Sequence, residues 1–406
     1  MKISMRVVLY HKQLTSLLGG GTFQPLTFIA ELQKTCDVVL ALNEGTDLAA
    51  VARMAEVDID AAKVRVVALD PVRGFVRRHP ALLALVRARR LKRLARDADV
   101  CISTANVVDF GQPGHHFVYL LSQFGGHAFY DYLMHPRGRL GIRRAYRRLT
   151  TALYENVAKP LFGIRPLRKI ISDPRERIYP TSKYVEGIVR GFYGPFNSHV
   201  FYPPTIFEFG DASVQRDPLL AIYVGRIFAP KHITDLVAMV ARARELTGKD
   251  LKLHIAGKLT DDPYVAELER LAAARPWLKL VGPVYGKEKE AFMLSATYAL
   301  HAERDEAFGI AIAEYLKAGC IPVVPDEGGP QEIVESPALA FRTVEDAART
   351  LARLLEDNAF RDAQRRHCAA RAKEFTVDAF RARQRALVAR ILHPANLKHQ
   401  PSKPKL

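Results

Sequence analysis

The segment Glu303–Val334 reads ERDEAFGIAIAEYLKAGCIPVVPDEGGPQEIV. Apolar runs of strand length lie just before it, at Tyr298–Ala302, and within it, at Ile321–Val324, whereas Gly309–Ala318 has the apolar period of a helix. Strand, loop, helix and strand in this order form the repeating unit of a parallel sheet covered by helices. This segment therefore predicts an α/β fold.

The same alternation runs through both halves of the chain. Apolar runs of strand length, separated by stretches of helical period, predict two doubly wound, Rossmann-like domains with ligands bound at the carboxyl ends of their strands. The remaining expected strands are Arg6–Tyr10, Val38–Leu42, Lys63–Leu69, Val100–Ser103, His116–Leu121 and Arg177–Pro180, then Leu219–Val224, Leu251–Ala256 and Leu278–Val281.

The length of 406 residues exceeds that of one ordinary domain. We expect a first domain over residues 1–200 and a second over 219–392, whose last helix can pack back on the first domain. A linker over 201–218 is indicated by Pro203-Pro204 and by the loss of periodicity after it. Residues 393–406 are rich in Pro and Lys, a composition typical of a disordered tail.

The composition is that of a globular protein, with 49% hydrophobic and 25% charged residues. The apolar runs are shorter than the roughly 20 residues that cross a bilayer. The four cysteines are far apart and form no CxxC pair, which favours free thiols and a cytoplasmic location and gives no zinc-binding spacing.

Positive charge is concentrated in the first half. The net charge is +17, and residues 72–169 contribute 19 Lys or Arg against five acidic residues. Such a field attracts polyanions, phosphorylated substrates or an anionic membrane surface. Within it, Leu82–Arg96 and Arg137–Leu161 are candidate amphipathic helices, which either lie on a membrane or pack apolar residues inward and turn arginines to solvent. No nucleic-acid-binding motif accompanies the arginines, so we expect no nucleic-acid partner.

The spacing of Glu306 and Glu314 points to a binding site around the start of a helix. Glu306 precedes the predicted helix and Glu314 lies more than one turn inside it. Because the first amides of a helix have no partner within it and face a positive dipole end, the backbone of Phe308, Gly309 and Ile310 is suited to hold a phosphate. The Glu314 carboxylate is then placed to bind two hydroxyls of a ribose.

These features together resemble the signature of the family 4 (group 1) glycosyltransferases of the GT-B fold. The resemblance rests on Glu306 and Glu314 followed by AGCIPVV, Gly328-Gly329-Pro330 and Glu332-Ile333-Val334. It extends to YVGRIFAPK, where Gly225 and Arg226 end a strand and Lys231 follows, and to Tyr179–Pro204, which is similar to the close of the first domain. Gly19-Gly20-Gly21 matches the early glycine loop of the family and predicts a turn there.

The resemblance implies two Rossmann-like domains facing a cleft: an acceptor domain, then a nucleotide-sugar domain. It implies transfer of a sugar, with retention of configuration, from a nucleoside diphosphate such as GDP-mannose or a UDP-sugar to a glycan or lipid-linked acceptor in polysaccharide or glycolipid synthesis. Arg226 and Lys231 are expected to hold the diphosphate and Glu306 the sugar. Glu314, Phe308, Gly309, Ile310, Gly225, Gly20 and Gly21 are expected to complete the donor site. No metal and no further cofactor is implied.

The acceptor side of the site is less defined. Many members of the family carry a histidine at the end of a first-domain strand, where this chain has Leu121, Ser122 and Gln123, so His115, His116 and His127 are the candidates. Asp58-Ile59-Asp60 and Asp97-Ala98-Asp99 each precede an apolar strand and are interpreted as turns, not metal-binding motifs. A sugar epimerase or phosphorylase, or a non-catalytic nucleotide-sugar-binding homologue, are the alternative functions. Cytoplasmic location, at the inner face of a membrane, is the corresponding expectation.

Overall fold

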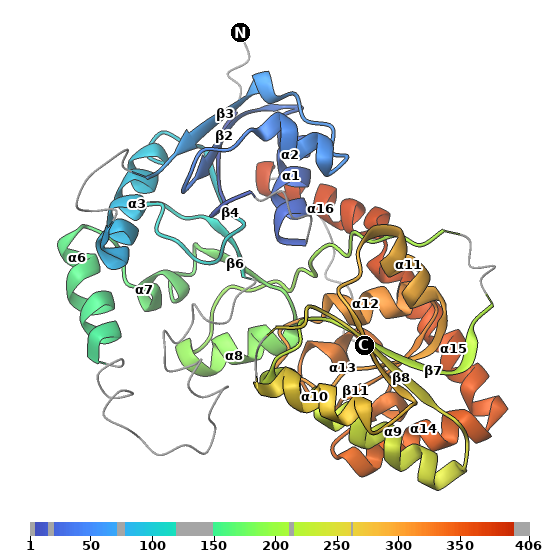
Figure 1. Cartoon of the computed structure of the whole chain (residues 1–406). Helices are drawn as coiled ribbons and strands as arrows, with labels where there is room; N and C mark the ends of the chain where they lie inside the picture. Colours follow the sequence, from blue (N-terminus) through green and yellow to red (C-terminus); the bar gives the residue numbers. More distant parts are fainter. Residues whose placement is uncertain are drawn as a thin grey trace. The chain divides into compact units, whose positions relative to one another are not determined.

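The computed structural model describes residues 5–14, 20–70, 78–118, 149–210, 215–260 and 263–393. The chain divides into two compact units (Figure 1). The first comprises Met1–Thr181, Val185–Pro204 and Phe380–Leu406, and the second comprises Ser182–Tyr184 and Thr205–Ala379. The expected disordered tail lies, apart from His393, outside the described residues, as do residues 211–214 of the expected linker.

The first unit contains a parallel sheet of six strands in the order β3-β2-β1-β4-β5-β6. This is the doubly wound order in which the chain starts in the middle, builds one side, and returns to build the other. The strands are β1 (Met5–Tyr10), β2 (Cys36–Leu42), β3 (Val64–Ala68), β4 (Val100–Ser103), β5 (His115–Val118) and β6 (Arg177–Pro180).

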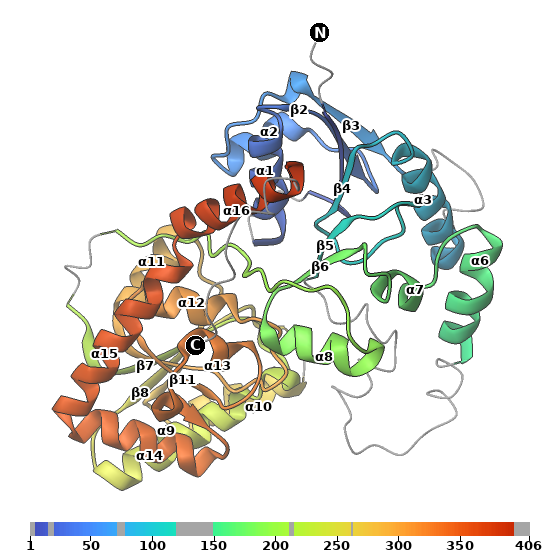
Figure 2. The ribbon, with the colours of Figure 1, turned by 180° about the vertical axis from the view of Figure 1, so that it is seen from behind.

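The helices of the first unit cover its sheet (Figures 1 and 2). They are α1 (Gly20–Leu32), α2 (Leu48–Met54), α3 (Pro80–Leu94), α7 (Leu167–Ile171), most of α8 (Lys183–Tyr193), and a helix over residues 149–161 that ends in α6 (Lys159–Leu161). The last helix, α16 (Val377–Leu392), belongs to this unit from Phe380 onward, where the Gln384 amide donates a hydrogen bond to Thr27.

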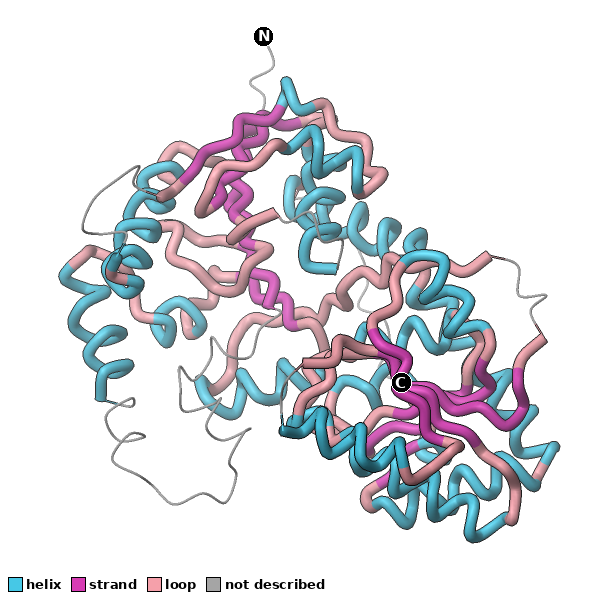
Figure 3. The backbone as a smooth tube through the Cα atoms, in the orientation of Figure 1, coloured by secondary structure: helices cyan, strands magenta, loops and turns pink. Residues whose placement is uncertain are grey.

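The second unit repeats the topology of the first, with the strand order β12-β11-β10-β7-β8-β9. Figure 3 shows its strands in magenta among the cyan helices. Its sheet is again parallel, and the reversal of strand order falls between β7 and β10. The strands are β7 (Asp217–Val224), β8 (Lys252–Ala256), β9 (Leu278–Gly282), β10 (Ala296–Leu300), β11 (Ile321–Pro325) and β12 (Ala340–Phe341).

The strands of the second unit are buried because helices cover both faces of the sheet. The β10 strand is buried along its whole length, and Tyr315 is enclosed and donates a hydrogen bond to a β7 carbonyl. The helices are α9 (Ile233–Thr247), α10 (Pro263–Ala273), α11 (Gly286–Leu294), α12 (Ile310–Lys317), α13 (Gly329–Val334), α14 (Val344–Glu356) and α15 (Asn358–Ala372).

The structure therefore confirms the α/β class and the two doubly wound sheets. The predicted glycine turn is wrong at Gly20 and Gly21, which form the first turn of α1. The first amides of a helix have no partner within it, so glycine is tolerated there at small cost and need not mark a break.

Both Asp-x-Asp motifs precede a strand, β3 and β4 respectively, and neither follows the carboxyl end of one. Asp60 accepts a hydrogen bond from the amide of Ala62 and caps a single 3₁₀ turn, and Asp99 accepts one from the amide of Arg6.

The basic stretch Leu82–Arg96 forms α3 and packs its apolar face inward. Leu91 is buried in one cluster with Val8, Val39 and Cys101 of the sheet. Because the leucines pack against the sheet, the arginines face outward. Of the two interpretations of this stretch, the structure therefore supports the helix that packs its apolar residues inward. Residues 137–148 of the second basic stretch lie outside the described residues.

Candidate functional site

The predicted site residues of the second unit gather at the reversal of strand order. Arg226 and Lys231 follow β7, and Glu303 and Glu306 follow the neighbouring strand β10. At such a point the two connections leave in opposite directions, so the carboxyl ends of the two strands are left open to a ligand. The topology thus brings together residues that are more than 70 positions apart.

Lys231 is at the centre of this arrangement. Its Nζ donates to Glu306 Oε2 at 2.6 Å and also to Glu303 Oε2. It lies at the end of the 3₁₀ turn Ala229–Lys231, and only 11% of its side chain is exposed. Burial disfavours the charged form, but the charges of Glu306 and Glu303 outweigh it and raise the pKa of Lys231. The lysine is therefore a fixed cation.

The two carboxylates have opposite proton affinities. Burial, with the neighbouring charge of Glu306, raises the pKa of Glu303 to about 7. Burial also disfavours ionisation of Glu306, but Lys231 and a hydrogen bond with Glu303 prevail and lower its pKa to about 2. The pair therefore holds one negative charge firmly on Glu306 and a second one that titrates near neutral pH.

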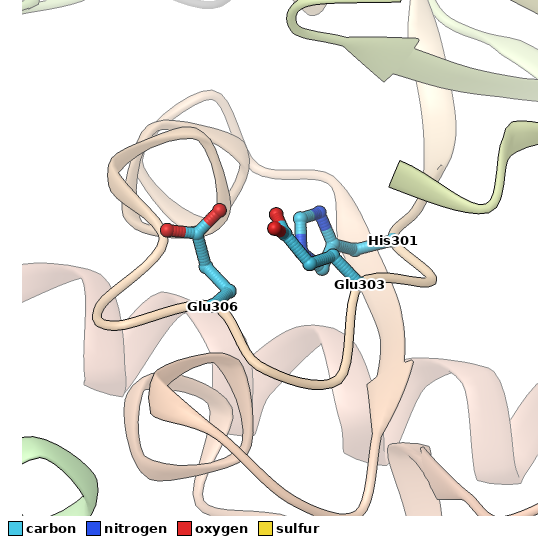
Figure 4. A group of neighbouring side chains, drawn as sticks. All are labelled: His301, Glu303 and Glu306. Atoms are coloured by element: carbon cyan, nitrogen blue, oxygen red, sulfur yellow. The ribbon is translucent and has the colours of Figure 1, made fainter. Parts of the chain in front are cut away.

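His301 completes the cluster and had no signal in the sequence. Figure 4 shows its imidazole directly behind Glu303, with the Glu306 carboxylate facing both. Potential ligand atoms of His301, Glu303 and Glu306 lie within 4.8 Å of one another, a set of types that holds divalent cations. In this structure the Lys231 ammonium contacts both carboxylates. Burial lowers the pKa of His301 to about 4, which keeps the ring neutral.

Gly309 shapes the start of α12. It is the residue before the helix and has φ of 96°, in the left-handed region that favours glycine. A Cβ there would lie 2.9 Å from the Ile312 Cδ1 atom. The amides of Ile310 and Ala311 open the helix beside the Glu306 loop, which is the arrangement that holds anions.

The Gly328-Gly329 pair holds the Glu306 loop in place. The Gly329 amide donates to the Glu306 carbonyl at 2.8 Å. A Cβ on Gly329 would lie 2.4 Å from Phe308 Cα, and one on Gly328 would lie 2.4 Å from the Arg304 carbonyl. Two backbones approach here so closely that only glycine fits, which gives a physical reason for the Gly-Gly-Pro motif.

Glu314 is the second carboxylate of the predicted pair and lies buried in α12. Both of its oxygens accept hydrogen bonds of 2.8 Å from Lys289, and the Lys289 ammonium also lies 4.7 Å from the centre of the Phe207 ring. Sequence reasoning missed Lys289 because it lies on α11, 25 residues before its partner. A ribose bound by Glu314 would share it with this lysine.

Arg226 is the more exposed of the two predicted phosphate-binding cations. Its guanidinium lies 4.9 Å from the ring centre of Phe228, and no ion pair from it to a carboxylate is recorded within the described part of the chain. Gly225 before it donates its amide to Ala256 of β8. Arg226 thus stands next to the Lys231 cluster with its charge available.

The segment Ser182–Tyr184 also belongs to this unit. Ser182 donates to the Ala307 carbonyl at 2.6 Å, and the Tyr184 hydroxyl donates to Asp305 at 2.9 Å. Both partners flank Glu306, so Ser182 and Tyr184 hold the loop in place from a part of the chain more than 120 positions away.

Two of the three histidines predicted for the acceptor side lie on one strand of the first unit. His115 and His116 begin β5, at the amino end of the strand, whereas ligands bind at the carboxyl ends. His116 is fully enclosed and its Nε2 is 2.9 Å from Glu176, and His115 bonds the Tyr179 hydroxyl. Their placement favours a structural role. His127, Leu121, Ser122 and Gln123 lie outside the described residues.

All the residues of the Lys231 cluster lie in a part of the chain that matches a known sequence family. Residues 207–375 match the family model of the glycosyl transferases group 1. The second unit therefore resembles the group 1 glycosyltransferases over most of its length. This match ends near the boundary of that unit and does not reach the first one.

A curated relative is the GDP-mannose-dependent alpha-mannosyltransferase of Mycobacterium tuberculosis, with 29% identity over 112 residues. The aligned part is 28% of this chain, and it spans about a quarter of the relative, 26% of its length.

Solved structures match almost the whole chain. Sucrose-phosphate synthase from Thermosynechococcus elongatus has a TM-score of 0.66 at 14% identity, covering 96% of this chain and 100% of that one. Anabaena HepE, in complex with UDP and glucose, has a TM-score of 0.62 at 13% identity, covering 95% and 99%. Together with the two parallel six-stranded sheets, these matches assign the GT-B fold.

Proposed function

We propose that this protein is a retaining glycosyltransferase that moves a sugar from a nucleoside diphosphate to a glycan or lipid-linked acceptor without a metal ion. The observation that carries the proposal is the fixed Lys231 cation against Glu306, beside the exposed Arg226 and the open amides at the start of α12. The match of residues 207–375 to the group 1 family supports it.

The reaction breaks the bond between the anomeric carbon and the diphosphate, and an acceptor hydroxyl bonds to that carbon and gives up its proton to an oxygen of the departing diphosphate. Negative charge grows on the departing diphosphate, so the enzyme gains most from cations and amides aimed there. Lys231, Arg226 and the α12 amides are the groups for that task. Glu306 then holds donor hydroxyls, and Glu314, with Lys289, the ribose.

The same geometry supports the proposal of metal independence. A divalent cation on a diphosphate neutralises charge and orients oxygens. Lys231 already occupies the position between Glu303 and Glu306 that such a cation would take. A metal ion would have to displace a lysine whose pKa is raised by those same carboxylates.

The donor is proposed as GDP-mannose or a UDP-sugar. The curated relative is named for GDP-mannose, and HepE was solved with UDP and glucose, so both bases occur among similar proteins. The acceptor is proposed as a glycan or a lipid-linked saccharide in the cytoplasm. Four unpaired cysteines, three of them buried, are typical of proteins from a reducing compartment.

A thermal-shift screen against UDP, GDP, ADP and their sugars tests the donor. A ligand that binds only the folded protein raises its stability according to concentration over affinity. We expect one base to raise the melting temperature in the wild type and to have much less effect in Lys231→Met. Equal shifts in both proteins would contradict the site.

The chemistry needs a separate assay. With donor and acceptor both present, a glycosyltransferase releases a nucleoside diphosphate and the new linkage keeps the anomeric configuration of the donor, as seen by proton coupling constants. Interconversion of donor sugars without an acceptor would favour an epimerase. Dependence of the reaction on inorganic phosphate would favour a phosphorylase, and binding of the donor without turnover would favour a non-catalytic homologue.

A further inference from the structure

The helix over residues 149–161 presents an apolar face to solvent. Leu149, Leu153, Val157 and Leu161 follow one another at intervals of four residues and are 59%, 52%, 48% and 78% exposed. A single exposed leucine needs no explanation, but a row of four on one helix marks an interaction surface.

The opposite side of this helix is attached to its own unit. Glu155 accepts a hydrogen bond from the Leu167 amide at 2.9 Å and pairs with Lys159 at 2.5 Å. Residues Tyr154–Ala158 form a wide π turn. Because residues four apart drift around an α-helix of about 3.6 residues per turn, one wide turn offsets the drift and helps keep the apolar side chains in a row.

Exposed arginines lie next to that row. Arg89, Arg93 and Arg96 lie on and just after α3, whose leucines face the core. Within the described residues no carboxylate pairs with any of the three, whereas Arg87 on the same helix is bound by Asp70. Their charges therefore remain available to an outside partner.

A cavity of about 520 Å³ joins the arginines to the apolar helix. Both figures of the ribbon place α3 and α6 together at one side of the first unit (Figures 1 and 2). The cavity is lined by Arg89, Lys92, Arg93, Arg96, Phe110, Gly111, Gln112, Pro160, Leu161, Phe162 and Gly163, without an acidic residue. Lys92 is bound to Asp109, so the three arginines provide the free charge.

We propose that the four apolar residues of helix 149–161 and the three arginines of α3, here called the docking surface, bind an anionic lipid bilayer. An apolar helix face beside a cluster of Arg is the pattern of proteins that lie in the membrane interface, with leucines among the acyl chains and arginines on lipid phosphates. In the part of the chain that the structure describes, no helix is long and apolar enough to cross a membrane.

The leucines distinguish this partner from a nucleic acid. A polyanion in water gains from the arginines but offers nothing to a row of aliphatic side chains. A bilayer satisfies both, because each arginine contributes electrostatic attraction and each leucine removes apolar surface from water.

Co-sedimentation of the full-length protein with vesicles tests the proposal, without donor or acceptor, so that its outcome is independent of sugar transfer. We expect binding to vesicles of equal parts phosphatidylcholine and phosphatidylglycerol and little binding to phosphatidylcholine alone. Arg89→Gln/Arg93→Gln/Arg96→Gln should weaken binding roughly a hundredfold, at roughly fivefold for each arginine. Leu153→Gln/Leu161→Gln should weaken it at least roughly tenfold.

The matched control is Arg365→Gln/Arg366→Gln/Arg385→Gln, which removes the same charge from exposed positions on α15 and α16. It should bind vesicles as the wild type does. An equal loss in the control, unchanged binding of the leucine variant, or equal binding to neutral vesicles would each overturn the proposal. Since all substituted residues are exposed, the melting temperatures should stay near that of the wild type, which verifies folding.

Discussion

The Lys231 ammonium lies 2.6 Å from the Glu306 carboxylate and also contacts Glu303, although the lysine precedes these residues by more than 70 positions. The contact adds a fixed cation to a loop that carries two neighbouring glutamates, Glu303 and Glu306. It places the residues expected to hold the phosphate and the sugar of the donor side by side.

Removing this cation should abolish most of the proposed transfer. Lys231→Ala is expected to lower kcat by roughly a hundredfold to a thousandfold, the loss seen when one charge-stabilising group is removed from an active site. Glu306→Gln should also lose most activity while the protein stays folded. Steady-state kinetics with thermal denaturation checks both. Lys252→Ala, which removes an exposed ion pair with Asp217, is the control and should keep full activity. Retained activity in both site variants would remove the site assignment.

Donor binding should weaken as the pH rises above about 7. The pKa of Glu303 lies near 7, mainly because the group is buried, and a bound diphosphate adds negative charge that raises it further. Above pH 7 binding therefore takes up a proton, and the dissociation constant should rise by up to roughly tenfold per pH unit. Calorimetry with a nucleotide sugar measures this, because its diphosphate has no group titrating in that range.

Glu303→Gln provides the comparison for the pH dependence. The amide keeps the shape of the side chain and does not titrate, so donor affinity should become nearly constant between about pH 6.5 and 8.5, a range that includes the Glu303 pKa of about 7. The same slope in the variant would assign the effect to another group and refute the role of Glu303.

The close approach of two loops predicts a cost for a single methyl group. In Gly329→Ala the new Cβ would lie within 2.7 Å of three backbone atoms of Ala307 and Phe308. Backbone cannot move aside as a side chain can, so we expect a loss of about 2 kcal/mol or more of stability, together with weaker nucleotide binding. Urea denaturation and the thermal-shift assay report the two effects.

Gly187→Ala serves as the matched control for that substitution. Gly187 lies inside α8, and its Cβ would meet nothing within 4 Å. Alanine is favoured over glycine in a helix by up to about 1 kcal/mol, so this variant should be as stable as the wild type or more so. Equal destabilisation by both changes would show that the loop contact is not the cause.

A buried ion network should govern the stability of the first unit. Arg165 donates to Asp109 at 2.8 Å and to Glu176 at 2.7 Å, and both carboxylates are inaccessible to solvent. Arg165→Met would remove one charged partner from each of two buried carboxylates, at a cost of about 3 kcal/mol. Arg175→Met is the control. Arg175 is exposed and pairs with Asp173, so its loss should change the free energy of unfolding little. Urea denaturation distinguishes the two.

The same network gives the first unit an acid-labile stability. Burial disfavours ionisation of Asp109 and Glu176. Hydrogen bonds from Arg165, His116 and backbone amides outweigh burial, and they lower the pKa of Asp109 below its ordinary 3.8 and that of Glu176 below its ordinary 4.5. In acid the unfolded chain then binds more protons than the folded one, so stability is lost as the pH falls through these values. Denaturation between pH 3 and 5, about where free carboxyls titrate, should show this loss, and a flat profile would contradict it.

The sequence by itself determined the local and the repeating features. Short apolar runs separated by stretches of helical period predicted nearly every strand of both sheets. Such a pattern is visible in the sequence because it depends only on residues within a few positions of one another. The short motif around Glu306 was likewise visible, since the loop, the left-handed Gly309 and the helix are encoded in consecutive residues.

Only the tertiary structure decided which distant groups meet. That Lys231 contacts Glu303 as well as Glu306, that Lys289 binds Glu314, and that His301 completes the cluster depend on the order of strands in the sheet, which no local pattern encodes. Gly20 and Gly21 were misjudged for a related reason, because glycine permits a turn but does not require one.

The basic helix α3 shows the same division. Its sequence shows arginines beside leucines, but it does not decide whether the leucine face or the arginine face of the helix is exposed. Packing against the sheet buried the leucines and turned the arginines outward, while the apolar row on helix 149–161 became exposed beside them. Burial depends on what covers a residue, and that is a property of the folded chain alone.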